Sequence, residues 1–121
     1  SERKATEERI RHMAQHDALT NLPNRALFSD RLQHELVAAK RNRERFALIF
    51  LDLDNFKPIN DRYGHDAGDR VLQEVAGRIR ASVRSADLAC RTGGEEFVVV
   101  LPGARRRVNS VFRGGEVACV Q

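Results

Sequence analysis

The feature that most constrains this chain is a continuous apolar run, Phe46 to Leu51, that ends abruptly in Asp52-Leu53-Asp54. Such a run has the length of a strand, is typical of one buried on both faces, and falls far short of the roughly 20 residues of a membrane-spanning helix. Because side chains alternate along a strand, Asp52 and Asp54 are predicted to point to the same side. The two carboxylates either cap a helix that begins near Asn55 or bind a divalent cation such as Mg²⁺.

The spacing of apolar residues predicts the other elements. Residues 1–15 are predicted to form a polar helix with a thin apolar edge, and residues 24–41 and 55–63 to form amphipathic helices. A further long helix is expected from the N-cap candidate Asp66 to about Val83. A Gly-Gly signal predicts a hairpin with strands 87–91 and 96–101 joined by residues 92–95, and residues 116–120 are at most a short strand. Helices mixed with few strands indicate an α/β (α+β) domain.

The predicted hairpin turn carries two further carboxylates, Glu95 and Glu96, directly after Gly93 and Gly94. Like charges repel at a tight turn, and a bound cation would relieve that repulsion. If the strand that ends at Asp52 lies beside this hairpin, the carboxylates converge on one edge of the sheet. They would then supply the hard oxygen ligands that Mg²⁺ prefers, while the glycines let a phosphate or a base approach the backbone.

Composition restricts the class of protein. The 121 residues, 41% of them hydrophobic and 31% charged, indicate one folded domain rather than a disordered chain or a disulfide scaffold. A net charge of +4 is reminiscent of nucleic-acid binders, but residues 1–101 hold 17 basic and 16 acidic residues, and the excess lies in residues 102–121. We therefore expect no nucleic-acid partner, and the basic run Lys40, Arg41, Arg43 and Arg45 is interpreted as a solvated face.

The two cysteines, Cys90 and Cys119, lack a metal-binding spacing and are interpreted as small apolar residues. Their use suits a reducing compartment, and no transmembrane or signal segment is predicted, so we expect a cytoplasmic location. The chain does not start with Met, so we expect it to be a piece of something longer.

Four blocks of the sequence, in order and spacing, resemble the GGDEF domain, the diguanylate cyclase family of bacterial signalling. They are residues 16–25 (HDALTNLPNR), 52–61 (DLDNFKPIND), 64–69 (GHDAGD) and 93–97 (GGEEF). The resemblance covers about residues 10–103 and predicts a linker helix over 1–15 and a domain core over 16–103. Residues 104–121 form an atypical basic tail that lacks the family's expected helix, strands and phosphate-gripping basic pair, which suggests a truncated or frame-shifted end.

The resemblance implies a palm-like sheet, as in nucleotide cyclases and polymerases, and the condensation of two GTP into cyclic di-GMP with release of pyrophosphate. It implies that Asp52, the carbonyl of Leu53 and Glu95 hold Mg²⁺ or Mn²⁺, with Glu95 as candidate base and Glu96 as its neighbour. Guanine would be read by Asn60 and Asp69, which are otherwise ordinary turn and first-turn residues. The backbone N–H groups of Asn55, Phe56 and Lys57, with Gly93 and Gly94, would meet phosphate oxygens.

Arg84 and Asp87 match the family's inhibitory RxxD pattern, which implies feedback inhibition by cyclic di-GMP. Because four-residue patterns are common, a solvated helix-end Arg beside a loop Asp is the alternative, but the position just before Gly93 favours the inhibitory site. The family also implies a homodimer during catalysis, because two GTP-loaded domains must face each other. Fused sensory or EAL phosphodiesterase domains are expected in the parent protein.

The leading hypothesis is a Mg-dependent diguanylate cyclase domain, which would be inactive in this chain if the missing parts are needed for catalysis. The alternative is a non-enzymatic module that binds GTP or cyclic di-GMP and regulates a neighbour.

Overall fold

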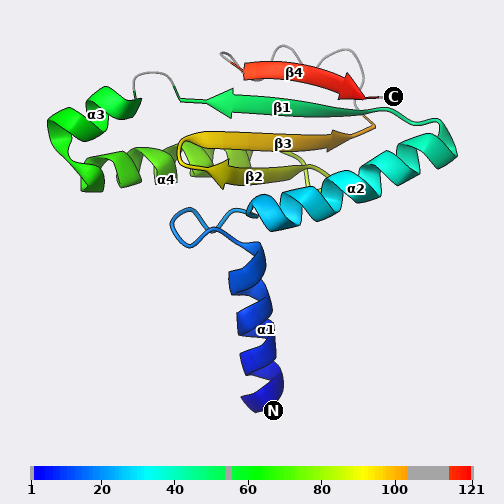
Figure 1. Cartoon of the computed structure of the whole chain (residues 1–121), viewed down its shortest axis with the longest axis horizontal. Coiled ribbons are helices and arrows are strands. Elements are labelled where there is room, and N and C mark those ends of the chain that lie inside the picture. Colours follow the sequence, from blue (N-terminus) through cyan, green and yellow to red (C-terminus); the bar gives the residue numbers. More distant parts are fainter. Residues whose placement is uncertain (1, 54–55, 104–114, 121) are drawn as a thin grey trace.

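The structure, a computed structural model, describes residues 2–53, 56–103 and 115–120, and only the backbone of the last segment. Helices surround a four-stranded sheet (Figure 1). The elements in chain order are α1 (Glu2–Gln15), α2 (Arg25–Asn42), β1 (Phe46–Asp52), α3 (Phe56–Tyr63), α4 (His65–Ser82), β2 (Leu88–Gly93), β3 (Glu96–Pro102) and β4 (Gly115–Val120).

The sheet has the strand order β2-β3-β1-β4, and each neighbouring pair is antiparallel. The apolar run predicted from the sequence forms β1, which is paired on both sides. Ile49 lies opposite Val99 of β3 and Val117 of β4. The predicted short strand near the C-terminus is therefore present as β4 and pairs with β1. Residues 104–114 of the predicted basic tail lie outside the described residues.

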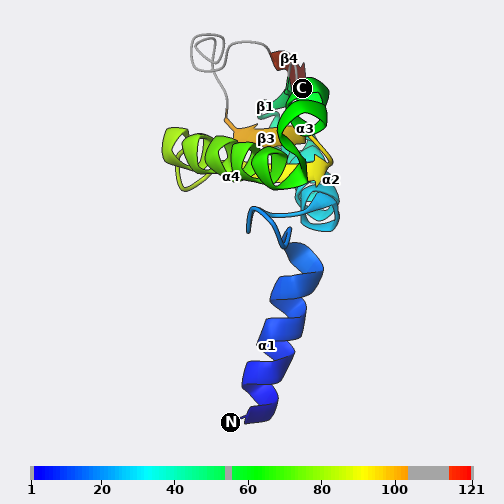
Figure 2. The same cartoon turned by 90° about the vertical axis from the view of Figure 1, so that its left-hand side faces the viewer.

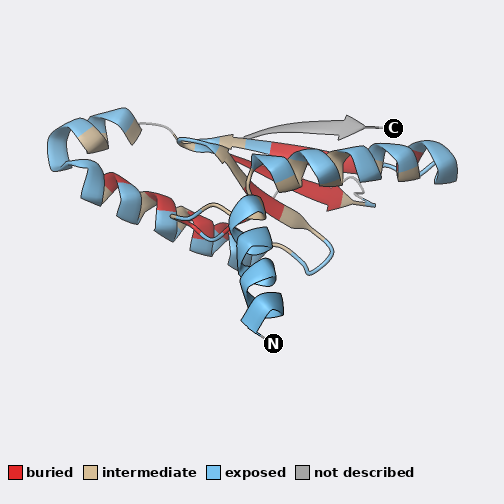
Figure 3. Ribbon diagram, turned by 60° about the horizontal axis from the view of Figure 1, so that its bottom comes forward, coloured by how far each residue is buried: buried red, intermediate tan, exposed pale blue. Residues whose placement is uncertain are grey.

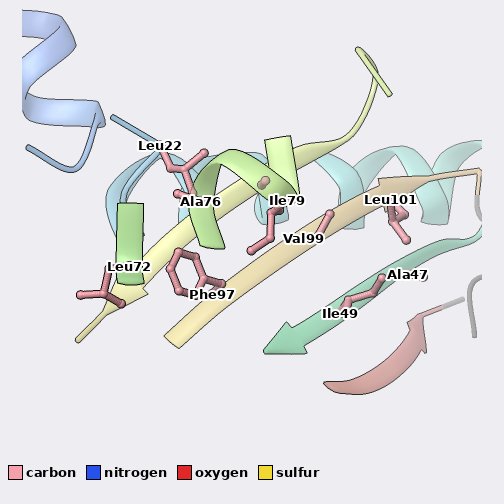
Figure 4. Close-up of a cluster of buried hydrophobic side chains, with 10 residues drawn as sticks. Leu22, Ala47, Ile49, Leu72, Ala76, Ile79, Phe97, Val99 and Leu101 are labelled. Atoms are coloured by element: carbon pink, nitrogen blue, oxygen red, sulfur yellow. The ribbon is translucent and has the colours of Figure 1, made fainter. Parts of the chain in front are cut away.

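Two apolar clusters lie on opposite faces of the sheet. The larger cluster packs Leu72, Ala76 and Ile79 of α4 against Ala47 and Ile49 of β1 and Phe97, Val99 and Leu101 of β3 (Figure 4). The smaller one contains Ala39 of α2 with Phe46, Leu48 and Val100. Because successive side chains of a strand point to opposite faces, one continuous apolar strand supplies both clusters.

Burial on both faces of β1 ends before the strand does. Phe46 to Ile49 are buried, whereas Phe50 is 37% exposed and Asp52 is exposed. The prediction of a strand buried on both faces is therefore correct for the first residues of β1 and wrong for Phe50. Cys90 is buried in β2, and this burial raises the pKa of its thiol to about 12, which fits its predicted role as a small apolar residue.

Helix α1 extends away from the sheet and has no buried residue (Figures 2 and 3). Its apolar residues Ile10 and Met13 are exposed, in agreement with the thin apolar edge seen in the sequence. Helix α2 lies within one residue of the predicted range 24–41: it begins at Arg25, and Asn24 is its N-cap, accepting a hydrogen bond from the backbone N–H of Leu27 at 3.1 Å. No helix in the described part of the chain is long and apolar enough to cross a membrane.

Two predicted boundaries are wrong. Asp66 is not an N-cap: α4 begins at His65, its N-cap is Gly64, and Asp66 lies in the first helical turn. Gly64 has φ +89°, which a glycine adopts readily and an aspartate does not. The hairpin loop is also shorter than predicted, because β2 extends to Gly93, which pairs with Glu96 and leaves Gly94 and Glu95 as the turn.

We expect Phe97→Ala to lower the free energy of unfolding by about 3–5 kcal/mol, because Phe97 is a fully buried aromatic side chain at the centre of the larger cluster. Phe50→Ala is the matched control, and its loss should be clearly smaller because Phe50 is partly exposed. Urea unfolding followed by circular dichroism measures both. Equal losses would show that the cluster is not the main core.

Candidate functional site

The end of β1 lies beside the β2–β3 turn. Asp52 is directly opposite Glu96 in the β1–β3 register, and the backbone N–H of the next residue, Leu53, donates to the carbonyl oxygen of Glu95 at 3.3 Å. Directly opposed residues of antiparallel strands have Cβ atoms about 4.5–5.5 Å apart. The predicted convergence of Asp52, Glu95 and Glu96 on one edge of the sheet is therefore present.

Side-chain hydrogen bonds hold the hairpin turn. Arg91 donates through Nε to the carbonyl oxygen of Gly94 at 2.9 Å, and the hydroxyl of Thr92 donates to Oε1 of Glu96 at 3.0 Å. The strand register shifts between Arg91 and Gly93, as in a β-bulge. Glu96 thus has a protein partner for its carboxylate. In the described part of the chain, no side chain forms a hydrogen bond or ion pair with the carboxylates of Asp52 and Glu95.

A partly buried ion pair anchors this turn to the loop that joins α1 and α2. Nη1 of Arg91 lies 2.9 Å from both carboxylate oxygens of Asp17, and the two side chains are only 15% and 22% exposed. The backbone N–H of Arg91 also donates to the carbonyl oxygen of Pro23 at 2.9 Å. Arg91 therefore connects three segments, namely the loop, β2 and the turn that carries Glu95.

Asp17 is held as a carboxylate. Burial alone would raise its pKa, but hydrogen bonds from the backbone N–H and the hydroxyl of Thr20, both at 2.8 Å, and the charge of Arg91 lower it below the usual 3.8. The Asp17–Arg91 pair was not predicted from the sequence. The available signal was a charged residue, Arg91, within a short and otherwise largely uncharged strand, since a charge in such a strand requires a partner.

The predicted guanine-reading residues come from two packed helices. Asn60 belongs to α3 and its side chain lies against Gly68 of α4, the residue before Asp69. Oδ1 of Asn60 is buried without a hydrogen-bond partner in the described part of the structure, whereas Asp69 is exposed. Figure 1 shows α3 and the start of α4 beyond the same end of the sheet as the hairpin turn.

The predicted phosphate-binding backbone is at the start of α3. Phe56 and Lys57 are the first two residues of that helix, so their N–H groups have no partner within it. Asn55, and Asp54 of the predicted acidic pair, lie outside the described residues. Gly93 and Gly94 are exposed, and an added Cβ at either would meet no atom within 4 Å, so the backbone of the turn is open to a ligand.

Arg84 and Asp87 form a closed turn at the opposite end of β2 from Gly93. Oδ2 of Asp87 accepts a hydrogen bond from the backbone N–H of Arg84 at 2.9 Å and lies 3.8 Å from Nε of Arg84. The side chain of Asp87 is 4% exposed, with Oδ1 unpaired within the described residues, whereas that of Arg84 is 79% exposed. The structure thus separates this pair from the carboxylates near Glu95 and leaves the guanidinium accessible.

The described residues include no group of three or more His, Cys, Asp or Glu side chains placed to hold a metal ion. Side chains alone therefore do not complete a metal site here. Asp52 at the end of β1 and Glu95 in the β2–β3 turn nevertheless offer carboxylates that bind no other described side chain, and the carbonyl of Leu53 follows Asp52 directly in the chain. That donor set fits Mg²⁺, which is commonly bound by one or two carboxylates together with substrate phosphates.

The antiparallel sheet flanked by helices matches solved structures of GGDEF domains. Over 96% of this chain, the structure superposes on the coiled coil and GGDEF domain of DgcB from Caulobacter crescentus in complex with c-di-GMP, with a TM-score of 0.81 and 29% identity. The match covers 72% of that chain. A TpbB GGDEF domain from Pseudomonas aeruginosa matches 86% of this chain at 39% identity, with a TM-score of 0.73, over 72% of its own length.

The sequence comparisons give the same family as the structural comparisons. Residues 14–113 match the family model described as "Diguanylate cyclase, GGDEF domain", so the chain belongs to the GGDEF family. It is 53% identical over 92 residues to the diguanylate cyclase TpbB of P. aeruginosa. The alignment covers 76% of this chain and 21% of TpbB. It is 54% identical over 89 residues to the bifunctional diguanylate cyclase/cyclic di-GMP phosphodiesterase MucR of the same species, covering 74% of this chain and 13% of MucR. The chain thus spans about a fifth or less of these two relatives.

We expect Asp17→Asn to lower the free energy of unfolding by about 2 kcal/mol near pH 7, because it leaves Arg91 half-buried without its counter-charge. The folded-state pKa of Asp17 lies below 3.8, so its contribution is complete above that value and is lost as pH falls through the folded-state pKa. Urea unfolding between pH 3 and 7 should show the two proteins converging at low pH. Asp30→Asn, at an exposed position of α2, is the control; a pH-independent difference for Asp17→Asn would contradict the assignment.

Proposed function

We propose that this chain forms part of a domain that condenses two GTP molecules into cyclic di-GMP and releases pyrophosphate. The observation that carries the proposal is the pair of carboxylates, Asp52 and Glu95, at the β1 end and the hairpin turn, neither of which binds another side chain among the described residues. The family provides the reaction, because the named relatives are diguanylate cyclases. This supports the same chemistry for the protein from which the chain derives.

Magnesium, or manganese, would be held by Asp52, Glu95 and the carbonyl oxygen of Leu53, with triphosphate oxygens completing the shell. When bound, the cation supplies charge neutralisation at the phosphates. The chain's own contribution is placement: the N–H of Leu53 fixes the carbonyl of Glu95, and Arg91 fixes that of Gly94. The carboxylate of Glu95 is thereby left free on a restrained turn.

The base and the phosphates would be bound on either side of these carboxylates. Asn60 and Asp69 offer a carboxamide and a carboxylate at the packed ends of α3 and α4. A carboxylate accepts hydrogen bonds from N1–H and the 2-amino group of guanine, a donor pair that adenine lacks. The free N–H groups of Phe56 and Lys57, together with the open Gly93-Gly94 backbone, suit phosphate oxygens; Asn55 is proposed to join them.

In the proposed reaction, the 3′-oxygen of one GTP attacks the α-phosphorus of a second, and the bond to pyrophosphate breaks. Glu95 accepts the proton of the attacking hydroxyl, with Glu96 beside it. Two such steps close the ring, so two domains with bound GTP must face each other as a homodimer. Dimerisation, like fused sensory or EAL domains in the parent protein, belongs to this proposal.

A second site at Arg84 and Asp87 would bind the product. The exposed guanidinium of Arg84 suits a phosphate oxygen, and Oδ1 of Asp87, buried and unpaired among the described residues, is proposed as an acceptor for an N–H donor of the ligand. Their turn is tied to α2, since Arg31 donates to the carbonyl oxygen of Ala86 at 3.2 Å. Cyclic di-GMP bound here would inhibit the enzyme at a distance from Glu95.

The test is incubation of the chain with GTP and Mg²⁺, followed by chromatographic separation of the nucleotides. We expect Glu95→Gln to abolish product formation, at least 100-fold, because it removes a charged ligand and the base at once. Its fold should be unchanged, since the side chain makes no hydrogen bond with other described residues. Glu44→Gln, at an exposed position before β1, is the matched control.

Cyclic di-GMP from the wild type and the control, but not from Glu95→Gln, would support the cyclase. Product from Glu95→Gln at the wild-type rate would contradict the role of this residue. GTP retained by the wild-type chain without turnover would favour the alternative of a nucleotide-binding module.

We further expect Arg84→Ala to weaken inhibition by added cyclic di-GMP by at least tenfold while leaving the initial rate unchanged, because it removes one charge-assisted contact far from the turn. The measurement is the initial rate against cyclic di-GMP concentration. Arg78→Ala, which breaks an exposed ion pair with Glu74 on α4, controls for loss of a surface charge. An unchanged inhibition curve in Arg84→Ala would exclude this site.

A further inference from the structure

Gly68 occupies a position in α4 where no side chain fits. A Cβ built on Gly68 would collide with Oδ1 of Asn60 and would lie 3.3 Å from Cζ of Phe56, both on α3. Gly68 is buried, and it lies inside an 18-residue helix, where glycine costs about 1 kcal/mol relative to alanine. A glycine at this position therefore lowers the stability of the helix, and the Asn60 carboxamide occupies the space that a side chain would take.

The same helix provides a contrast. Gly77 also lies within α4, but a Cβ there would meet no atom within 4 Å, and the residue is exposed. An alanine at Gly77 would fit without moving any neighbour. The steric requirement for glycine is thus specific to Gly68, the position that faces Asn60.

A Cβ at residue 68 would displace the side chain of Asn60 rather than its backbone. The backbone carbonyl of Asn60 accepts from the N–H of Gly64 at 2.8 Å at the end of α3, so its main chain is held in place. The side chain would have to leave its rotamer. Its Oδ1 is buried with no hydrogen-bond partner among the described residues, and an unsatisfied buried acceptor costs about 1–3 kcal/mol. A ligand that brings an N–H donor would remove that cost.

We propose that Gly68 is a positioning residue for base selection: by lacking a side chain, it holds the Asn60 carboxamide in the orientation that accepts a hydrogen bond from the 2-amino group of guanine. The inference rests on the proposed function, because it presumes that Asn60 contacts the base. It adds a specificity determinant that itself touches no ligand. Its consequence is a preference for GTP over ITP, whose hypoxanthine base lacks the 2-amino group.

The experiment measures binding of GTP and of ITP, each with Mg²⁺, to the full chain by isothermal titration calorimetry. The proteins are the wild type, Gly68→Ala, Asn60→Ala, the double variant, and Gly77→Ala as the matched control. We expect Gly68→Ala to reduce the GTP/ITP affinity ratio about tenfold, the value of one hydrogen bond, to the level of Asn60→Ala. Gly77→Ala should retain the wild-type ratio.

The double variant separates positioning from general packing. In the Asn60→Ala background, the oxygen that would collide with a Cβ at residue 68 is absent. Adding Gly68→Ala to Asn60→Ala should therefore leave the GTP/ITP affinity ratio unchanged and should not lower the melting temperature. If Gly68→Ala alone does not fold, a double variant that melts like Asn60→Ala supports the proposal. A double variant that also fails to fold overturns it, because Gly68 would then serve helix packing alone.

Other outcomes distinguish the two proposals. If Asn60→Ala loses the preference for GTP and a folded Gly68→Ala keeps it, the role of Gly68 is wrong and guanine reading by Asn60 stands. If the wild type binds GTP and ITP equally, or binds neither, the proposed guanine site fails and the role of Gly68 fails with it.

Discussion

The register between β1 and β3 is the constraint on which the site depends. It sets Asp52 opposite Glu96 and brings Leu53 to the carbonyl of Glu95. A slip of one strand by one residue would turn each of its side chains to the opposite face of the sheet, so the packing of different residues on the two faces opposes it. Opposed like charges cost up to about 1 kcal/mol, whereas each buried apolar side chain of the core contributes about 1.5–3 kcal/mol. The core therefore outweighs the repulsion at the site.

Polar contacts add further restraints on the β2–β3 turn. The turn at Gly94 and Glu95 is restrained from β1 by the N–H of Leu53 and from the N-terminal loop by Arg91 with its partner Asp17. Because both restraints act on backbone carbonyls of the turn, the carboxylate of Glu95 is not used in holding it. A rigid turn with a free acidic side chain is the arrangement that ligand or metal binding requires.

The sequence predicted those parts of the fold that depend on local pattern. Strand β1 follows from its apolar run, α2 from the spacing of its apolar residues, and the acidic edge from placing β1 beside the hairpin. The Asp17–Arg91 pair joins residues 74 positions apart, so no local pattern reveals it. Asp66 was wrongly assigned as a cap because side-chain preference was considered without the positive φ that selects Gly64. The fit of Asn60 to Gly68 required the packing of two helices.

Unpaired groups show what a ligand must bring. The carboxylates of Asp52 and Glu95, Oδ1 of Asn60 and Oδ1 of Asp87 lack protein partners among the described residues, and all of them are hydrogen-bond acceptors. A ligand that matches them carries cations or N–H donors, and guanine nucleotides with a divalent metal carry both. A fold that leaves acceptors unpaired at separate places accepts a cost in stability that ligand binding offsets. The free chain is therefore less stable than its core alone would make it, and the deficit lies at the proposed binding sites.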